Sequence, residues 1–159
     1  MAELNHSAQA IQTYRTICLA LDQLELIYQK DDEKLTVETG IRGEDLPVTF
    51  RYVVDGERKV VSVLSRLPFA VQEDKRLEVG IAVAVINNRL ADGCFDYDIT
   101  EGKLFFRMTN SFMDSTLGAD VFKYMFFGAC KIIDEYNDKF LMIAKGMMTV
   151  EQLLDQENG

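Results

Sequence analysis

Hydrophobic and polar residues recur along this chain with two different periods, and the change of period divides it into elements. Residues 7–24 predict a helix, since apolar side chains at spacings of three and four share one helical face. The residues that set this spacing are Ile11, Tyr14, Cys18 and Leu21. Asn5 or Ser7 can cap the helix, because short polar side chains accept hydrogen bonds from a first turn. The acidic run 31–33 then predicts a solvated turn.

The next part of the chain has the period of two that is typical of strands. Residues 34–43 and 46–67 predict three strands, because β-branched and aromatic residues recur at alternate positions. Asp55-Gly56 separates two of these runs and is typical of a hairpin turn, since both residues tolerate positive φ. With an even loop, one hairpin face carries Val48, Phe50, Tyr52 and Val54 beside Val61 and Val63.

A second helix is predicted over residues 71–90, where an acidic start suits the helix dipole. After Leu77 this segment is apolar nearly all round, so we expect it to be buried on more than one side. A strand over residues 79–86 is the alternative, which the charged turn before it and the total length disfavour.

The last part of the chain predicts a hairpin within residues 94–108, a long helix over roughly 118–144 and a short helix over 149–156 with Thr149 as its cap. The apolar stripe of the long helix comprises Val121, Phe122, Met125, Phe126, Ala129, Ile133, Tyr136 and Phe140, and Tyr124 and Phe127 widen it. The order of elements is therefore α-β-β-β-α-β-β-α with a small terminal helix. The 159 residues contain no linker or repeat, so we expect a single domain over 1–159.

Composition excludes some classes of partner. Acidic residues outnumber basic ones 26 to 17, giving a net charge of −9. Nucleic acids and anionic membrane surfaces are bound through clustered Lys and Arg, and this chain has no basic run, so neither partner is expected. No apolar stretch is long enough to span a membrane, and the N-terminal residues lack the pattern of a signal peptide. A cytoplasmic location is the resulting expectation.

Cysteine and histidine offer little chemistry. Cys18, Cys94 and Cys130 are widely spaced and fit reduced thiols buried as small apolar groups. A zinc site or a histidine-activated nucleophile would have to use His6, the only histidine, near the N-terminus. We therefore expect His6 to be a solvated residue at a helix start.

The sequence DYDIT at residues 96–100 is the strongest candidate for a catalytic or metal site. It could be the nucleophile motif of a metal-dependent phosphotransferase using Asp96 and Asp98. However, few apolar residues precede Asp96 and no Asp-Asp pair follows, so a buried strand and a metal clamp are both missing. It could also open a calcium loop, but the positions that need Gly and Glu hold Glu101 and Arg107.

A β-hairpin explains more of the same stretch. With an even loop at Glu101-Gly102, one face carries Phe95, Tyr97 and Ile99 beside Leu104, Phe106 and Met108. The other face then carries Asp96, Asp98, Thr100, Lys103 and Arg107, whose opposite charges can pair across the strands. The sequence therefore predicts no catalytic, cofactor-binding or metal-ligating residue here and no cofactor.

The second half of the chain carries a family pattern. Its features are Ile86-Asn87, Gly93, FDYD at 95–98, Gly102, LFFR at 104–107, Ala129, Tyr136, Gly146 and TVEQLL at 149–154. From about residue 80 to 154 the chain resembles the YbjN family of bacterial sensory-transduction regulators. The resemblance implies an α+β fold shared with class I type III secretion chaperones. In that fold a small twisted antiparallel sheet of about five strands packs against helices, generally in a dimer.

The resemblance also sets the functional expectation. It implies a non-enzymatic protein that binds another protein as a regulator or chaperone-like module, since such chaperones bind extended segments of their clients. The alternative is a dimeric structural protein without a client. Tyr124 and Phe127 lie off the main stripe of the long helix, so we expect them at a homodimer contact or a client groove unless another segment covers them.

Overall fold

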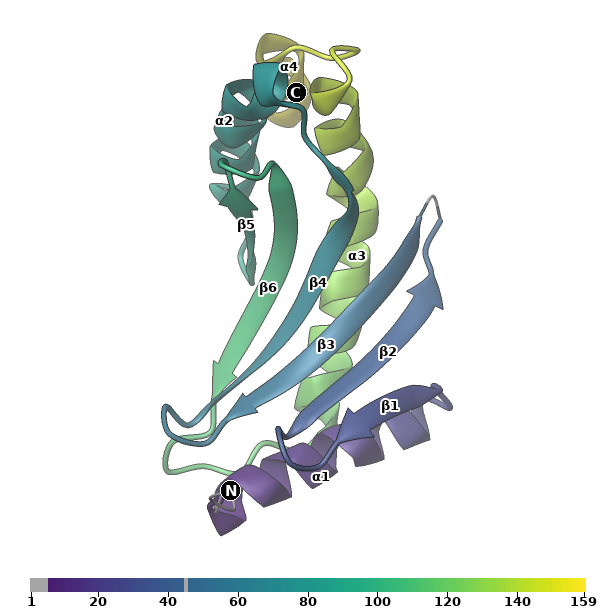
Figure 1. The fold of residues 1–159 in the computed structure, drawn as a ribbon, viewed down its shortest axis with the longest axis vertical. Coiled ribbons are helices and arrows are strands. Elements are labelled where there is room, and N and C mark those ends of the chain that lie inside the picture. Colours follow the sequence, from purple (N-terminus) through teal and green to yellow (C-terminus); the bar gives the residue numbers. More distant parts are fainter. Residues whose placement is uncertain (1–5, 45) are drawn as a thin grey trace.

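A computed structural model describes residues 6–44 and 46–159 as a six-stranded antiparallel sheet with helices packed against it (Figure 1). The strands lie in the order β1-β2-β3-β4-β6-β5. In chain order the elements are α1 (Ala8–Gln23), β1 (Tyr28–Asp31), β2 (Thr36–Arg42), β3 (Pro47–Asp55), β4 (Val60–Ala70), a 3₁₀ turn (Glu73–Lys75), α2 (Arg76–Asn87), β5 (Cys94–Asp98), β6 (Lys103–Ser111), α3 (Ala119–Ala144) and α4 (Val150–Asn158). The predicted α+β class, with an antiparallel sheet packed against helices, is confirmed.

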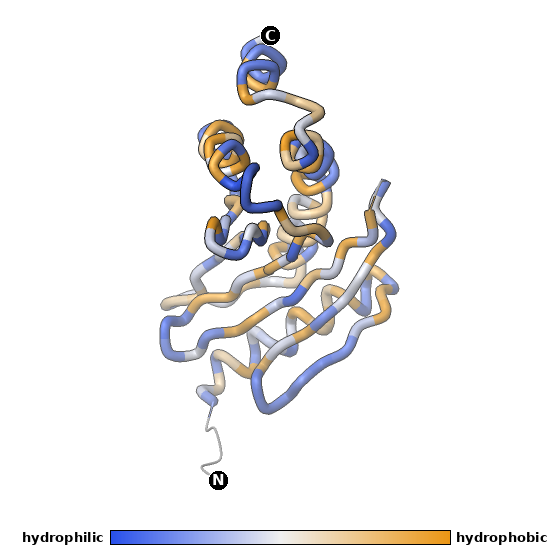
Figure 2. Tube along the Cα trace, turned by 45° about the horizontal axis from the view of Figure 1, so that its top comes forward, coloured by the Kyte–Doolittle hydropathy of each residue, from blue (hydrophilic) through white to orange (hydrophobic). Residues whose placement is uncertain are grey.

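One face of the sheet is buried beneath α1 and α3. Alternate residues of β3, β4 and β6 point to this face and are almost fully buried, and hydropathy alternates along the strands (Figure 2). The long helix α3 runs behind the sheet, and α2 and α4 lie together at its C-terminal end (Figure 1). The opposite face, which carries Arg51, Leu64 and Phe105, is called the open face below, because no described helix covers it.

The predicted register of the first hairpin is confirmed. Tyr52 lies opposite Val63 and Val54 opposite Val61, all on the buried face. The turn itself differs from the prediction. Asp55 is the last strand residue, its carboxylate accepts hydrogen bonds from two backbone N–H groups of the loop, and Lys59 rather than Gly56 has a positive φ.

Two parts of the sequence-based order need correction. The structure has a sixth strand, β1, that pairs with β2, so four strands rather than three precede α2. Its sequence YQKD is short and polar because it is an edge strand, and it carries no alternating pattern. The acidic run 31–33 accordingly begins at the end of this strand, and Asp31 caps the turn that follows.

Helix α2 is shorter and less buried than predicted. It begins at Arg76 after the 3₁₀ turn, and Val79, Ala82, Val83 and Ile86 form its single buried face. Leu77 and Ile81 are exposed, because nothing in the described chain covers the far side of this helix. The predicted helix caps at Ser7 and Thr149 are confirmed. Ser7 caps α1, and Thr149 caps α4 with a reciprocal capping box. Asn5, the alternative cap of α1, lies outside the described residues.

The sheet separates between β3 and β4. These strands pair from Asp55 opposite Val60 as far as Arg51 opposite Leu64, and no further. Continuing that register would set Pro47 opposite Pro68, the only prolines in the chain. Neither proline has an N–H group to donate, so neither strand can extend a regular ladder there. The gap between residues 47–50 of β3 and 65–69 of β4 is called the split below.

Candidate interaction surface

The DYDIT stretch forms a hairpin, as predicted. In β5 and β6, Phe95 lies opposite Phe106 and Tyr97 opposite Leu104, so the predicted face packs into the core. The Phe95 ring meets the Phe106 ring edge-on with centroids 5.3 Å apart. Ile99 is the exception, since it lies in the turn and is half exposed.

The two aspartates have separate structural roles. Asp96 accepts hydrogen bonds from Arg107 through both carboxylate oxygens, at 2.7 and 3.1 Å. The Arg107 guanidinium lowers the pKa of Asp96 below its ordinary value. Asp98 ends the strand, and its carboxylate accepts hydrogen bonds from the N–H groups of Thr100 and Glu101. Both carboxylates are thus engaged within the hairpin, and they do not converge on one point.

Because the Asp96–Arg107 pair is half exposed, we expect Asp96→Asn to lower the free energy of unfolding by under about 1 kcal/mol, the range for surface ion pairs. The lowered pKa means that this contribution is present above the unfolded-state pKa and is lost as pH falls through the folded-state pKa. Urea unfolding of the wild type and of Asp96→Asn at neutral and acidic pH measures this contribution to stability. A saturable rise in melting temperature with Ca²⁺ or Mg²⁺ that vanishes in the variant would show instead that Asp96 binds a metal.

The remaining candidate residues for chemistry are dispersed. The ring nitrogen Nε2 of His6 lies 2.6 Å from the Glu33 carbonyl oxygen, so the residue is tied to the β1–β2 turn rather than fully solvated. The three cysteines are free and partly buried. Burial raises the pKa of the Cys130 thiol to about 12, which disfavours a reactive thiolate. Within the described residues, no group of three His, Cys, Asp or Glu side chains could hold a metal ion.

The outer side of α3 presents an apolar surface. Tyr124 and Phe127, one helical turn apart, are each 56% exposed, and together they are called the α3 patch below. The Phe127 ring rests edge-on against buried Phe126, with ring centroids 5.5 Å apart. The sequence-based alternative, that α2 or the C-terminal segment covers these rings, is wrong for the described chain.

The α3 patch borders a groove. A cavity of about 440 Å³ lies between the start of α3 and the end of β6, and Tyr124, Val121, Met108 and Asp92 contribute to its walls. The Tyr124 hydroxyl donates a hydrogen bond to the Asp92 carboxylate. Aromatic side chains with one polar end are favoured at protein interfaces, and this arrangement leaves the ring exposed and oriented.

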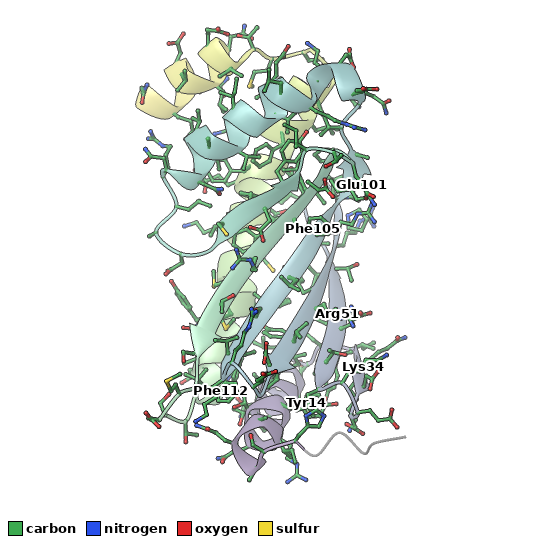
Figure 3. All side chains as sticks on the ribbon, turned by 60° about the vertical axis from the view of Figure 1, so that its left-hand side comes forward. Tyr14, Lys34, Arg51, Glu101, Phe105 and Phe112 are labelled. Atoms are coloured by element: carbon green, nitrogen blue, oxygen red, sulfur yellow. The ribbon has the colours of Figure 1, made fainter. Side chains whose placement is uncertain are left out.

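Two further surfaces were not found from the sequence. One is the exposed side of α2, which carries Leu77 and Ile81. The other is a cavity of about 600 Å³ on the open face, where Arg51, Leu64, Arg66 and Phe105 line the mouth of the split. Figure 3 shows Arg51 and Phe105 side chains on the strands of this sheet. Strand parity places Arg51, Leu64 and Phe105 on one face, but it does not show where β3 and β4 separate, and the shape of the second surface depends on that separation.

Comparison with solved structures places the fold. YbjN of E. coli, a candidate transcription regulator, superimposes with a TM-score of 0.57 at 14% identity, over 79% of this chain and 91% of that one. The HopA1–SchA chaperone–effector complex contains a chain that matches with a TM-score of 0.55 at 12% identity, over 90% of this chain and 98% of that one. The ExsC–ExsE complex contains another, with a TM-score of 0.52 at 14% identity, over 77% of this chain and 90% of that one.

These matches confirm the predicted likeness to YbjN and to secretion chaperones at the level of the fold. The chaperone match covers nine tenths of this chain, so the likeness extends to the first half, where the sequence matched only in the order of its elements. No family model matches the sequence, and no curated protein matches it either. Among the described residues, no helix has the length and apolar character needed to cross a membrane.

Proposed function

We propose that this protein is a non-enzymatic, chaperone-like protein-binding module that acts in the cytoplasm as a homodimer, with residues 1–159 as one domain. The observation that carries the proposal is the α3 patch, two aromatic rings that are more than half exposed on the surface of a folded chain. Contiguous exposed apolar surface usually marks an interface with another protein. The three free cysteines fit a reducing compartment.

The fold adds to the support. Two of the structural matches come from complexes, HopA1–SchA and ExsC–ExsE. The fold therefore occurs in proteins that are bound to a partner. The residues best suited to catalysis, Asp96 and Asp98, are held in a hairpin by Arg107 and by backbone N–H groups. The phosphotransferase alternative therefore has no pair of free carboxylates at this position.

The homodimer can be tested by light scattering at tens of micromolar protein. We expect a mass twice that of the 18.1 kDa chain for the wild type. Phe127→Glu should reduce the mass to that of one chain, because it places a charge in an apolar contact between subunits. The variant should stay folded, because Phe127 is half exposed in the free chain. Circular dichroism and the melting temperature of the variant at low concentration would verify that the fold is retained.

A matched control comes from the other exposed apolar helix surface. Leu77→Glu on α2 makes the same kind of change at a side chain that is 69% exposed. If the α3 patch is the contact, the Leu77 variant stays dimeric. A dimer that splits with Leu77→Glu and survives Phe127→Glu would move the interface to α2, and a wild-type mass of one chain would exclude the dimer.

The competing function is a dimeric structural protein without a client. The two can be distinguished by affinity purification from the native host followed by mass spectrometry, with the purified partner then mixed back with the protein. Direct binding of a reconstituted partner supports the protein-binding module. A dimer that retains no partner in this experiment would favour the structural alternative.

A further inference from the structure

The split leaves two strand edges without partners in the middle of the sheet. Residues 47–50 of β3 pair only with β2, and residues 65–66 of β4 pair only with β6. Residues 67–69 of β4 pair with neither neighbour, because the β4–β6 register shifts between Arg66 and Ala70. Figure 1 shows these parts of β3 and β4 diverging. Unpaired edges carry N–H and C=O groups that can accept an added strand.

The chain itself cannot fully close this gap. Pro47 and Pro68 stand at its mouth, and a proline cannot donate to a ladder. Ser65 is the first β4 residue beyond the last pair with β3. It is buried, with an exposed fraction of 3%, and its hydroxyl has no hydrogen-bond partner in the described chain. By strand parity this hydroxyl points to the helix side of the sheet, as Val63 and Leu67 do, so the hydrogen-bonding groups left for an occupant of the split are those of the unpaired backbone edges.

The side chains around the split select for an apolar and acidic occupant. Leu64, Phe69 and Phe105 provide apolar walls to the 600 Å³ cavity on the open face. Arg51 and Arg66 border the same cavity; Arg51 shares its charge with Glu38 at 3.3 Å, whereas Arg66 forms no ion pair within the described chain. By strand parity Arg42 and Arg107 lie on this face too. Arg107 is already paired with Asp96, so Arg66 and Arg42 are the arginines of the open face that form no ion pair within the described chain.

We propose that the split binds an extended, acidic segment of a client protein. The segment's backbone bonds to the free edge of β4 or β3, one apolar side chain enters between Leu64 and Phe105, and a carboxylate two residues away pairs with Arg66. In a strand, residues two apart point to the same side, which is the spacing that places both side chains on the open face. This inference rests on the proposed protein-binding function and gives it a client site on the side of the sheet opposite to the α3 patch.

The probe is a library of phage-displayed random 12-residue peptides selected on the immobilised full chain. We expect selected sequences to carry Asp or Glu two residues from an aliphatic or aromatic residue. Fluorescence polarisation of a labelled selected peptide should show at least about a tenfold loss of affinity with Arg66→Glu, because a paired charge becomes a repelling one. Phe105→Ala should reduce affinity by a similar factor by removing an apolar wall.

Arg58→Glu is the matched control. It makes the same charge reversal in the β3–β4 loop at the other end of the paired region, on a side chain that is 82% exposed. We expect its affinity to stay within about twofold of the wild type. In ¹⁵N spectra of the wild type, bound peptide should slow amide hydrogen exchange at residues 48–50 and 65–67, as added strand pairing requires.

Several results would overturn the split as the client site. Selected peptides that bind Arg66→Glu and Phe105→Ala as well as the wild type would do so while leaving the protein-binding function intact. A labelled single-stranded dT12 that binds as tightly as the peptides would assign the arginines to nucleic acid instead. If the library yields no binder and no partner is recovered from the host, the site and the proposed function fail together.

Discussion

Phe106→Ala is expected to lower the free energy of unfolding by about 3–5 kcal/mol, the range for truncating a fully buried aromatic side chain. Phe106 is completely buried on the helix side of β6, and its ring packs against Phe95. Gly93 approaches so closely that a Cβ there would lie 2.6 Å from the Phe106 ring, so the ring is tightly packed and its removal would leave a cavity. Urea unfolding followed by tyrosine fluorescence or circular dichroism measures the change.

Phe105→Ala is the matched control, since it removes the same ring from the neighbouring residue. Phe105 points to the open face and is partly exposed, so its loss should cost well under half as much. Unchanged urea m-values in both variants would show that the denatured state is unaffected. A larger cost for Phe105 than for Phe106 would mean that the register of β6 is shifted by one residue.

The sequence alone predicted those elements that are determined by residues close together in the chain. The β5–β6 hairpin follows from alternation on both sides of one glycine turn, and the register then places Phe95 opposite Phe106. The α3 stripe follows from helical spacing along most of the helix, and the Thr149 cap follows from four adjacent residues. In each case the residues that determine the structure are neighbours in the chain.

Other features depend on contacts that neighbours cannot reveal. Strand β1 is polar because it is held by its pairing with β2 and not by burial, so it has no hydrophobic signature. The apolar far side of α2 suggested a second covering element, and the described chain supplies none. The split was signalled only by the two prolines, and their meaning depends on a register between β3 and β4 that local sequence does not fix.

Three glycines of the family pattern have a shared physical basis. Gly93, Gly102 and Gly146 are the glycines that have a positive φ in the described chain, at +73°, +71° and +70°. That region of backbone space is unfavourable for residues with a Cβ atom. At these three positions of the family pattern the backbone conformation, rather than any chemistry, restricts the residue, so they indicate a fold and not a catalytic site.

Gly102→Ala should be the most damaging of these substitutions, with an expected loss of about 2–5 kcal/mol. A left-handed conformation costs a residue with a Cβ roughly 1–2 kcal/mol. The new methyl group would also overlap the Val71 backbone, whose N–H donates a 2.7 Å hydrogen bond to the Gly102 carbonyl. Because a strand end and not a flexible side chain stands in the way, relief requires moving the β4–α2 connection, at a cost of about 1–3 kcal/mol.

Gly40→Ala separates this effect from the loss of glycine as such. Gly40 lies within β2 without a positive φ, and a Cβ there would make only an ordinary contact, 3.5 Å from the Val48 carbonyl oxygen. Alanine at this position should be neutral or stabilising by about 0.4–1 kcal/mol, since it restricts the unfolded chain without straining the folded one. Urea unfolding midpoints of the two variants provide the comparison. If Gly102→Ala were as stable as Gly40→Ala, the β5–β6 turn would not be locked against Val71, and the end of the hairpin could move independently of β4 and α2.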